Sequence, residues 1–273
     1  EAAREHVHPD RATAVVVGDA RKIHGALEGI APISLWNTDF ERMEPEDLEV
    51  RRSDVALQAS RIRRGTFGYS LRIQGKPLGE MTMTVESTGD GGVRIREEMK
   101  GQISRTATYE MTGDLSPVSS SMEASMGPVS LARDLTYEGA RVTGEATVPD
   151  RSDQGGGSGM PSTRRVSVDT TLAEGTLDAS MNTAAVLASP LSEGFELQAP
   201  VFSPGQGVNS LDVTVTGRET VEVPAGSFET WSVDVEGPEQ TATIYVTREA
   251  PHLMVKQEVA GQPVTVVLTD TGS

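Results

Sequence analysis

The segment from residue 220 to residue 237 reads Thr-Val-Glu-Val-Pro-Ala-Gly-Ser-Phe-Glu-Thr-Trp-Ser-Val-Asp-Val-Glu-Gly, and its pattern decides the fold. Val221 and Val223 alternate with polar neighbours, Pro224-Ala225-Gly226 interrupts the run, and the two-residue period resumes at Trp231. A two-residue period places apolar side chains on one face of a β-strand, and Pro and Gly favour turns. The segment therefore predicts a β-hairpin.

The same period continues on both sides of this hairpin. Downstream, it predicts three further strands, at Ala242–Val246, Leu253–Val259 and Val264–Leu268. Upstream, Phe67–Ile73 and Met81–Val85 alternate in the same way, and Gly89-Asp90-Gly91-Gly92 is typical of a hairpin turn. The remaining predicted strands are 93–99, 103–111, 118–126, 129–137, 141–148 and 164–170. The chain is therefore expected to be mainly β, with an antiparallel meander of strands.

Two segments of this region have a different character. Residues 150–163 contain Gly155-Gly156-Gly157 and predict a flexible loop. Leu177–Leu191 predicts a helix that ends before Pro190 and covers the sheet with a weakly apolar face.

The amino-acid sequence of the C-terminal part resembles that of a known family. Val-Pro-Ala-Gly-Ser-Phe-Glu-Thr-Trp at 223–231, followed by Ala-Pro-His-Leu-Met-Val-Lys at 250–256, resembles a family of bacterial envelope domains of unknown function. That family is related in fold to periplasmic lipoprotein carriers. The resemblance implies a large half-open antiparallel β-barrel or curled sheet with one covering helix, and an extracytoplasmic location. It implies a fold more firmly than an activity.

The first 36 residues predict a short α/β remnant. The expected elements are a helix end at Arg4–Pro9, a buried strand at Ala12–Val17, a helix at Ala20–Leu27 and a strand at Ile33–Trp36. The wording around Val15-Val16-Val17-Gly18-Asp19 resembles the closing segment of a pitrilysin or insulinase-type zinc peptidase domain. The His-x-x-Glu-His signature of that family is absent, because Ala2 stands where the first ligand is needed.

These observations divide the chain into three parts. Residues 1–36 form the remnant, residues 37–61 are a charged linker and residues 62–273 form the antiparallel β-domain. The chain begins at Glu1 with no initiator Met or signal sequence, so we expect a processed product or a fragment.

Composition excludes several classes of function. The formal net charge of −16 argues against nucleic-acid binding and against adhesion to anionic lipid headgroups. There is no cysteine and therefore no thiolate metal site. No apolar run is long enough to span a bilayer. The oligomeric state is not predictable from these features.

Catalytic and metal sites are not expected. His6 and His8 have no third ligand at a readable spacing, and His252 is expected to fix a turn through a hydrogen bond. No Gly-x-Ser-x-Gly elbow occurs. Strand alternation places several of the carboxylates Glu97, Glu98, Asp234 and Glu236 on the solvent face. We therefore expect no enzyme and no cofactor.

The methionines and aromatic residues suggest one kind of site. Many of them fall at inward positions, where they either fill the core or form an adaptable lining for an apolar ligand. The candidate ligand-binding residues are Phe67, Tyr69, Met81, Met83, Tyr109, Trp231 and Tyr245. The resulting hypothesis is a non-catalytic binding or accessory domain that holds an acyl chain or lipoprotein segment, or contacts an envelope protein.

Two alternatives stay open. The chain is the C-terminal accessory part of a zinc metallopeptidase whose catalytic motif lies elsewhere, or it is a structural module with a fully packed interior.

Overall fold

The computed structural model describes residues 14–18, 20–27, 30–37, 40–45, 52–127, 129–150 and 162–272. The chain divides into two compact units, residues 1–50 and residues 51–273. The division falls inside the segment 37–61, which the sequence predicts to be a linker. The predicted boundaries at residues 36/37 and 61/62 stay predictions.

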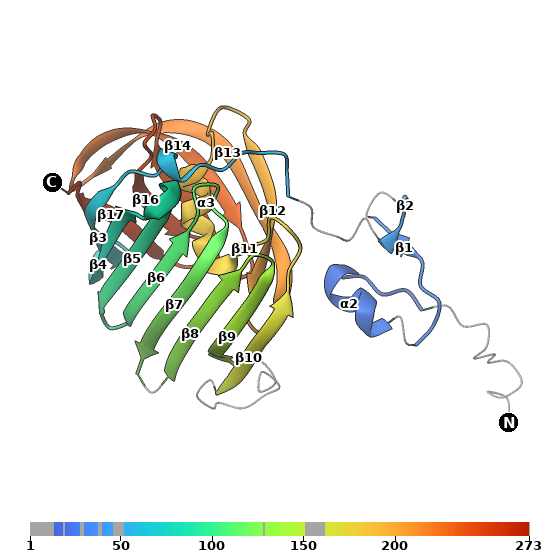
Figure 1. The fold of residues 1–273 in the computed structure, drawn as a ribbon. Coiled ribbons are helices and arrows are strands. Elements are labelled where there is room, and N and C mark those ends of the chain that lie inside the picture. Colours follow the sequence, from blue (N-terminus) through green and yellow to red (C-terminus); the bar gives the residue numbers. More distant parts are fainter. Residues whose placement is uncertain are drawn as a thin grey trace, which may run out of the picture. The chain divides into compact units, whose positions relative to one another are not determined.

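The described residues of the first unit include one helix and two short strands (Figure 1). The helix α2 is Ala20–Leu27, as predicted, and β1 (Leu35–Trp36) pairs antiparallel with β2 (Arg42–Met43). The prediction of a buried strand is wrong for residues 14–17, which have no regular structure. Val15 is 85% exposed and Val17 is 94% exposed, since no described strand pairs with this run. The predicted helix end at 4–9, with His6 and His8, lies outside the described residues.

The second unit is built on one sheet of fifteen strands, whose order is β10-β9-β8-β7-β6-β5-β4-β3-β17-β16-β15-β14-β13-β12-β11. The strands are β3 (Gly65–Ile73), β4 (Lys76–Ser87), β5 (Val93–Gly101), β6 (Ser104–Met111), β7 (Pro117–Met126), β8 (Val129–Glu138), β9 (Arg141–Pro149), β10 (Thr163–Thr171), β11 (Leu177–Asp178), β12 (Glu196–Ser203), β13 (Gly207–Val223), β14 (Gly226–Glu236), β15 (Thr241–Thr247), β16 (Met254–Val259) and β17 (Val264–Asp270).

The topology of this sheet follows the predicted meander. Neighbours in sequence are neighbours in the sheet, except for β10 and β11, which form its two edges. In addition, β17 pairs with β3 and so joins the two halves of the chain. The short strand β11 runs parallel to β12, which makes the sheet mixed. The edge strands β10 and β11 do not pair with each other, so the curled sheet is not closed (Figure 1). The predicted half-open β fold is confirmed.

The predicted hairpin is β13 and β14, joined at Pro224-Ala225. Val223 pairs with Gly226, and a register shift between Val215 and Gly217 bends the long strand β13. The amide of Ala225 donates to the carbonyl oxygen of Leu268 at 3.3 Å. The hairpin tip is therefore tied to β17 and not only to its own strands.

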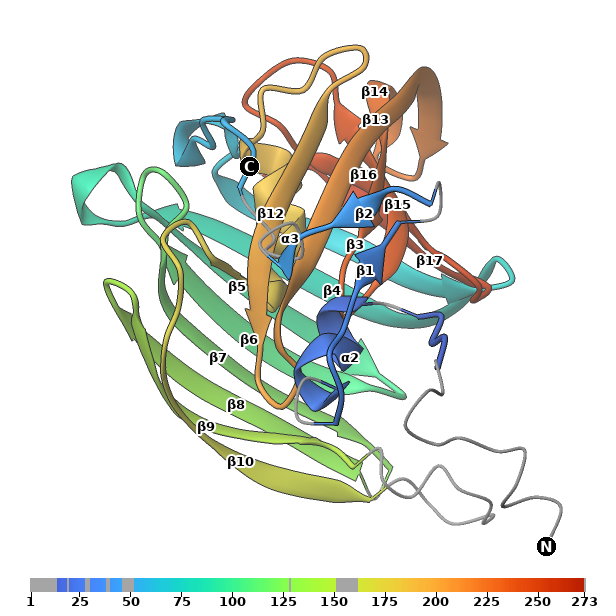
Figure 2. The ribbon, with the colours of Figure 1, turned by 90° about the vertical axis from the view of Figure 1, so that its right-hand side faces the viewer.

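The helix of this unit differs from the prediction. The segment expected as a helix at 177–191 consists of β11, a 3₁₀ turn at Ala179–Met181 and the seven-residue α3 (Asn182–Ala188). Residues 184–188 are all buried, and Figure 2 shows α3 enclosed by the curling sheet. The helix is a central plug and not a cover on one face. Its alanines allow this, because small side chains let the surrounding strands approach closely.

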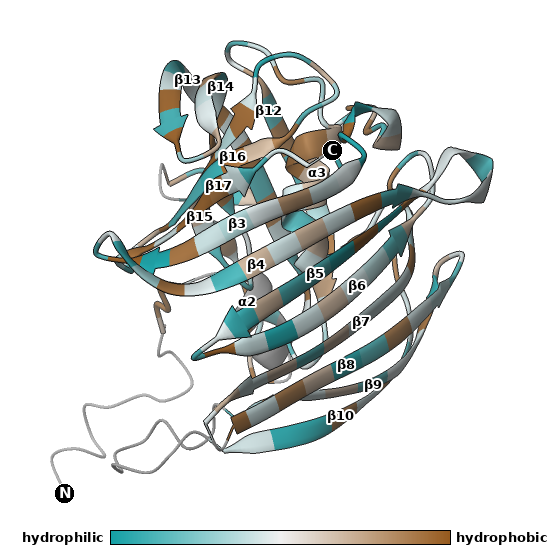
Figure 3. Ribbon diagram, turned by 90° about the vertical axis from the view of Figure 1, so that its left-hand side faces the viewer, coloured by the Kyte–Doolittle hydropathy of each residue, from teal (hydrophilic) through white to brown (hydrophobic). Residues whose placement is uncertain are grey.

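The core follows the strand alternation. In β4, Met81, Met83 and Val85 are buried between exposed or half-exposed neighbours, and Figure 3 shows this alternation of hydropathy along the strands. The main cluster surrounds α3 and includes side chains from both halves of the sheet. A second cluster joins β8, β9 and β10 to Phe202 of β12, and consists of Leu135, Tyr137, Val142, Val168, Leu172 and Phe202. The second cluster packs the two ends of the open sheet together.

His252 fixes the turn before β16, as predicted. Its Nδ1 lies 2.8 Å from the carbonyl oxygen of Thr247, and its backbone amide donates to the carbonyl oxygen of Arg61. Ile62 and His252 form an isolated parallel bridge. The side chain is buried, and burial lowers the pKa of His252 below its usual value of 6.5.

This pKa shift predicts a pH dependence of stability. Well above pH 6.5 the imidazole is neutral in both the folded and the unfolded chain, so its protonation does not affect stability. Below that pH the unfolded chain binds the proton first, and the free energy of unfolding falls until the folded pKa is reached. We expect the wild-type Tm to fall more than that of His252→Gln between about pH 7.5 and about pH 5.5. Equal shifts in both proteins would contradict this.

Candidate functional site

The inner face of the sheet carries a group of charged side chains. They occupy strand positions at which the alternation of buried and exposed residues predicts core side chains. Glu97 of β5 lies between Ile95 and Met99 on this face, and Arg133 of β8 lies between Leu131 and Leu135. Paired residues of neighbouring strands share a face, and Glu97 pairs with Ala107 of the main core. These charges therefore point toward the interior of the curl.

The first half of the group is built on β5 and β6. Arg105 Nη1 donates to Glu97 Oε2 at 2.9 Å, and Arg105 Nη2 donates to the hydroxyl of Tyr109. The side chain of Glu97 is 15% exposed and that of Arg105 is 30% exposed. This ion pair is thus largely withdrawn from water but still accessible at one side.

The second half joins β8 to segments from the other end of the chain. Arg133 Nη1 lies 3.1 Å from Glu239 Oε1, in the connection between β14 and β15, and 3.8 Å from Asp178 Oδ1 of β11. Tyr137 donates from its hydroxyl to Asp178 Oδ2 at 2.6 Å. The amide and hydroxyl of Ser180 also donate to Asp178 Oδ1. The buried carboxylate therefore accepts three hydrogen bonds and lies beside one guanidinium group.

The two halves influence each other electrostatically, because the charge of Glu239 in the second half raises the pKa values of Arg105 and Tyr109 in the first. Together we call them the inner network: Glu97, Arg105, Tyr109, Arg133, Tyr137, Asp178 and Glu239. Burial raises the pKa of Tyr109, and the charge of Glu97 raises it further. Burial alone would lower the pKa of Arg133, but the negative charges of Asp178 and Glu239 outweigh it and raise the pKa. Both tyrosines of the network are neutral at physiological pH, because burial also raises the pKa of Tyr137.

The inner network also bridges the open side of the sheet. No backbone ladder joins β8–β10 to β11 and β12. Arg133 and Tyr137 instead reach Asp178, and Phe202 packs against the second cluster. Among the described residues, these side-chain contacts therefore join the two ends of the sheet.

Sequence reasoning missed most of this network. It named Tyr109, but as an apolar lining residue, and it placed several carboxylates, Glu97 among the candidates, on the solvent face. The detectable signal was Arg133, which interrupts an inward series of Leu131, Leu135 and Tyr137. Its partner Glu239 could not be found this way, because the two residues are 106 positions apart in the chain.

The seven candidate ligand-binding residues are all buried, but not in one place. Six belong to the main core around α3: Phe67, Tyr69, Met81, Met83, Tyr109 and Trp231. The hydroxyl of Tyr69 donates to the carbonyl oxygen of Met254 at 3.0 Å. Trp231 is flanked by Arg218 and Arg248, whose guanidinium carbons lie 5.3 and 5.5 Å from the ring centroid.

The seventh residue, Tyr245, is not on the inner face. It packs with Val221 and Val255 in a separate small cluster, and its hydroxyl donates to Glu258 Oε2 at 3.0 Å. Burial and this carboxylate raise the pKa of Tyr245 to about 12. The role of the seven residues as a ligand lining stays a prediction.

Other apolar side chains of the inner face are accessible. They lie where β7 ends and β8 begins (Figure 1), and we call Ala124, Met126, Val129 and Leu131 the apolar rim. Met126 is 54% exposed and the other three are half-buried. None of the four packs in the three core clusters. The apolar rim is adjacent to the inner network, since Ala124 pairs with Arg105 on one side and with Leu131 on the other.

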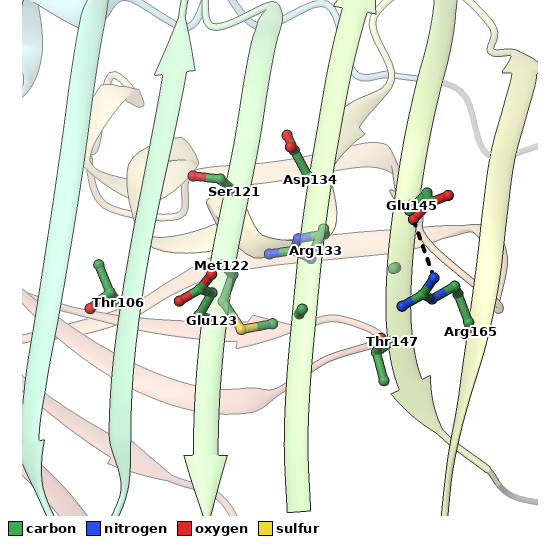
Figure 4. Close-up of a pocket in the computed structure, with 11 residues that line it drawn as sticks. Thr106, Ser121, Met122, Glu123, Arg133, Asp134, Glu145, Thr147 and Arg165 are labelled. Atoms are coloured by element: carbon green, nitrogen blue, oxygen red, sulfur yellow. Dashed lines mark ion pairs between the residues drawn. The ribbon is translucent and has the colours of Figure 1, made fainter.

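A trough of about 320 Å³ is lined by residues of the neighbouring strands β6 to β10 (Figure 4). Its lining includes Glu123, Asp134 and Glu145, which alternate with the inward residues of the same strands and so point outward. Arg165 reaches Glu145 at 4.0 Å in an exposed ion pair. The trough is open and solvated.

Two features are absent from the described part of the chain: a metal-binding group of side chains and a membrane-spanning helix. Among its residues, no three His, Asp or Glu side chains are grouped so that they could hold a metal ion. No helix of this part is long and apolar enough to cross a membrane.

Comparison with known proteins identifies the family. The family model described as a protein of unknown function, DUF3108, matches residues 68–269. The chain belongs to the DUF3108 family. The DUF3108 match begins after residues 1–36, so the peptidase resemblance of that segment gains no support and stays a prediction.

Solved structures of low sequence similarity also match. A β-barrel-like DUF1849 protein from Brucella abortus is 10% identical, with a TM-score of 0.44, over 77% of this chain and 98% of that chain. A candidate lipoprotein from Parabacteroides distasonis is 10% identical, with a TM-score of 0.25, over 79% of this chain and 98% of that chain. A candidate exported protein from Bacteroides fragilis is 12% identical, with the same TM-score and the same two coverages. No curated protein matches the sequence.

Proposed function

We propose that this DUF3108 protein is a non-catalytic binding domain that acts outside the cytoplasm and holds one apolar chain on the apolar rim. The observation that carries the proposal is the partial exposure of Ala124, Met126, Val129 and Leu131 on the inner face of the sheet. The extracytoplasmic location rests on the resemblance of the C-terminal strands to bacterial envelope domains.

The energetic argument is apolar burial. Removing apolar surface from water contributes about 25 cal/mol per Å². The main core around α3 is already packed, and its side chains have little surface left to bury. The apolar rim is the part of the inner face where a ligand gains such contacts.

The charges nearby favour binding over catalysis. Each guanidinium of the inner network faces a carboxylate, and both tyrosines have a raised pKa and stay protonated. No group of the network is therefore prepared as a base or a nucleophile. We propose that these residues position the strands around the ligand.

A neutral fluorescent probe tests this function. N-phenyl-1-naphthylamine is expected to bind wild-type protein with increased fluorescence. Leu131→Asp should weaken binding at least about tenfold, because a carboxylate on an apolar contact surface must be desolvated. Ser130→Asp is the matched control, since Ser130 is exposed on the opposite face of the same strand. The proposal fails if the two variants bind the probe equally well.

A further inference from the structure

The strand β10 forms one border of the sheet, and no described strand pairs with its outer side (Figure 3). It is nine residues long, whereas β11 at the other border has only two residues. Its pairing with β9 has no bulge, and it contains no proline. Short length, proline, bulges and charged residues are the usual features that keep an exposed edge from pairing, and of these β10 has only charge. Its edge is therefore available to a further strand.

Two hydrogen bonds establish which backbone groups of β10 point away from β9. The amide of Leu172 donates to the carbonyl oxygen of Ala140, and the amide of Asp150 donates to the carbonyl oxygen of Ser162, both at 2.8 Å. Each bond joins two residues that the strand register places opposite one another. Hydrogen-bonded pairs alternate along antiparallel strands, so the even-numbered residues of β10 bond to β9. The odd-numbered residues direct their N–H and C=O groups outward, and they are 163, 165, 167, 169 and 171.

The sequence of β10 is complementary to itself in the antiparallel direction. When Ser167 lies opposite Ser167 of a second copy, Arg165 lies opposite Asp169 and Val166 lies opposite Val168. Odd-numbered residues then face odd-numbered residues, so each free N–H group meets a free C=O group. The side chain of Arg165 is 77% exposed and that of Asp169 is 64% exposed, so both are accessible to a second copy.

The charges of β10 select this register over others. Opposite charges that face each other across an antiparallel pair are stabilising, and like charges are destabilising. A slip of two residues places Arg165 opposite Ser167 or Thr171 and removes the charge pairs. A slip of four residues places Arg165 opposite Arg165, or Asp169 opposite Asp169. The centred register is therefore the one in which the charges favour pairing.

The neighbouring strand extends this charge pattern on the outer face. Within one chain Arg165 lies 4.0 Å from Glu145 of β9, and Asp169 lies 3.0 Å from Arg141 of β9. In the centred register the row across the two copies is Glu145, Arg165, then Asp169 and Arg141 of the second copy. Negative and positive groups alternate along this row, so each inner charge has a counter-charge on both sides.

We infer that two copies of this chain associate through β10, antiparallel and with Ser167 on the two-fold axis, so that their two sheets become one continuous sheet. A two-fold contact uses the same surface on both copies, which a self-complementary strand provides. The apolar rim lies on β7 and β8, so this association is independent of the proposed function. The contact is small, so we expect a dimer above about 10 µM, whereas unfolding measured at about 1 µM reports on the monomer.

Exchange of the two charges tests the inference by sedimentation velocity of the full chain. About 150 mM salt screens the repulsion between two acidic molecules. Arg165→Asp or Asp169→Arg alone places like charges opposite each other at two positions, and each should weaken the dimer at least about tenfold. An equimolar mixture of the two variants should restore the dimer. In the mixed pair the introduced carboxylate faces the introduced guanidinium, and the remaining Asp169 faces the remaining Arg165.

Glu123→Arg is the matched control for Asp169→Arg. It changes the net charge equally, but Glu123 is exposed on β7, three strands from β10, so the dimer should persist. Wild-type protein that stays monomeric up to about 200 µM would overturn the inference. A dimer that both charge variants retain, or that their mixture does not restore, would also overturn it.

A cross-link provides a second test that does not depend on the charge variants. The chain has no cysteine, so Ser167→Cys introduces a single thiol at the two-fold axis. Its Cα would lie about 5.5 Å from that of the second copy, within the range of a disulfide. In the same dimer the two Thr163 residues are about 26 Å apart. We expect mild oxidation to cross-link Ser167→Cys but not Thr163→Cys, and equal yields from the two variants would overturn the register.

Discussion

Arg133→Ala is expected to destabilise the domain by about 3–5 kcal/mol, because it leaves a buried carboxylate without its counter-charge. Asp178 has no exposed surface, and Arg133 is the cation beside it, at 3.8 Å. The same change removes the contact with Glu239 and so loosens the open side of the sheet. Urea unfolding of wild type and variant measures the difference.

Two variants control this result. Arg165→Ala removes another arginine from the same half of the sheet, but its side chain is 77% exposed and its ion pair spans 4.0 Å. It should change the free energy of unfolding by less than about 0.5 kcal/mol. Adding Asp178→Asn to Arg133→Ala should restore part of the stability, because the uncompensated charge is then gone. The structural role of the network would be refuted if Arg133→Ala lowered the free energy of unfolding no more than Arg165→Ala does.

Gly144→Ala is expected to lower the free energy of unfolding by roughly 2–4 kcal/mol. Gly144 has a φ of 145°, and a Cβ at this position would overlap the carbonyl oxygen of Asp134. The methyl group would therefore force β9 away from β8. That displacement also separates Leu135 from Val142, which belong to the cluster that packs the ends of the sheet.

Gly139→Ala isolates the steric part of this effect. Gly139 also has a positive φ, of 60°, but a Cβ added there would have no other atom within 4 Å. Its substitution should cost only the backbone penalty, about 1–2 kcal/mol. If thermal unfolding shows the same loss of stability for the two variants, the overlap with the carbonyl oxygen of Asp134 is relieved without any loss of folding free energy.

The fold was predictable where a local pattern determines it. Alternation along Phe67–Ile73 and around the turn at Pro224-Ala225 gave the strands of the meander with nearly correct ends. The pairing of β17 with β3 and the enclosure of α3 were not predictable, because they depend on contacts between distant parts of the chain.

The site was predictable only in part for the same reason. Inward positions identified Tyr109 and the core methionines, but alternation cannot distinguish a packed core residue such as Met83 from an accessible one such as Leu131. Met126 and Leu131 differ from Met83 because the strand pair β7–β8 extends beyond the packed interior. This difference depends on the lengths of the strands and on the position of α3. A short stretch of sequence contains no information about either.

The most direct test of the central claim locates the ligand. A dodecanol that carries a photoreactive diazirine on its alkyl chain would be irradiated with the protein, and the modified residues would be mapped by peptide mass spectrometry. We predict that the labels fall on 122–133, around the apolar rim, and that Leu131→Asp removes them. Labels confined to the outer face, or labelling of 122–133 that Leu131→Asp leaves unchanged, would contradict the account.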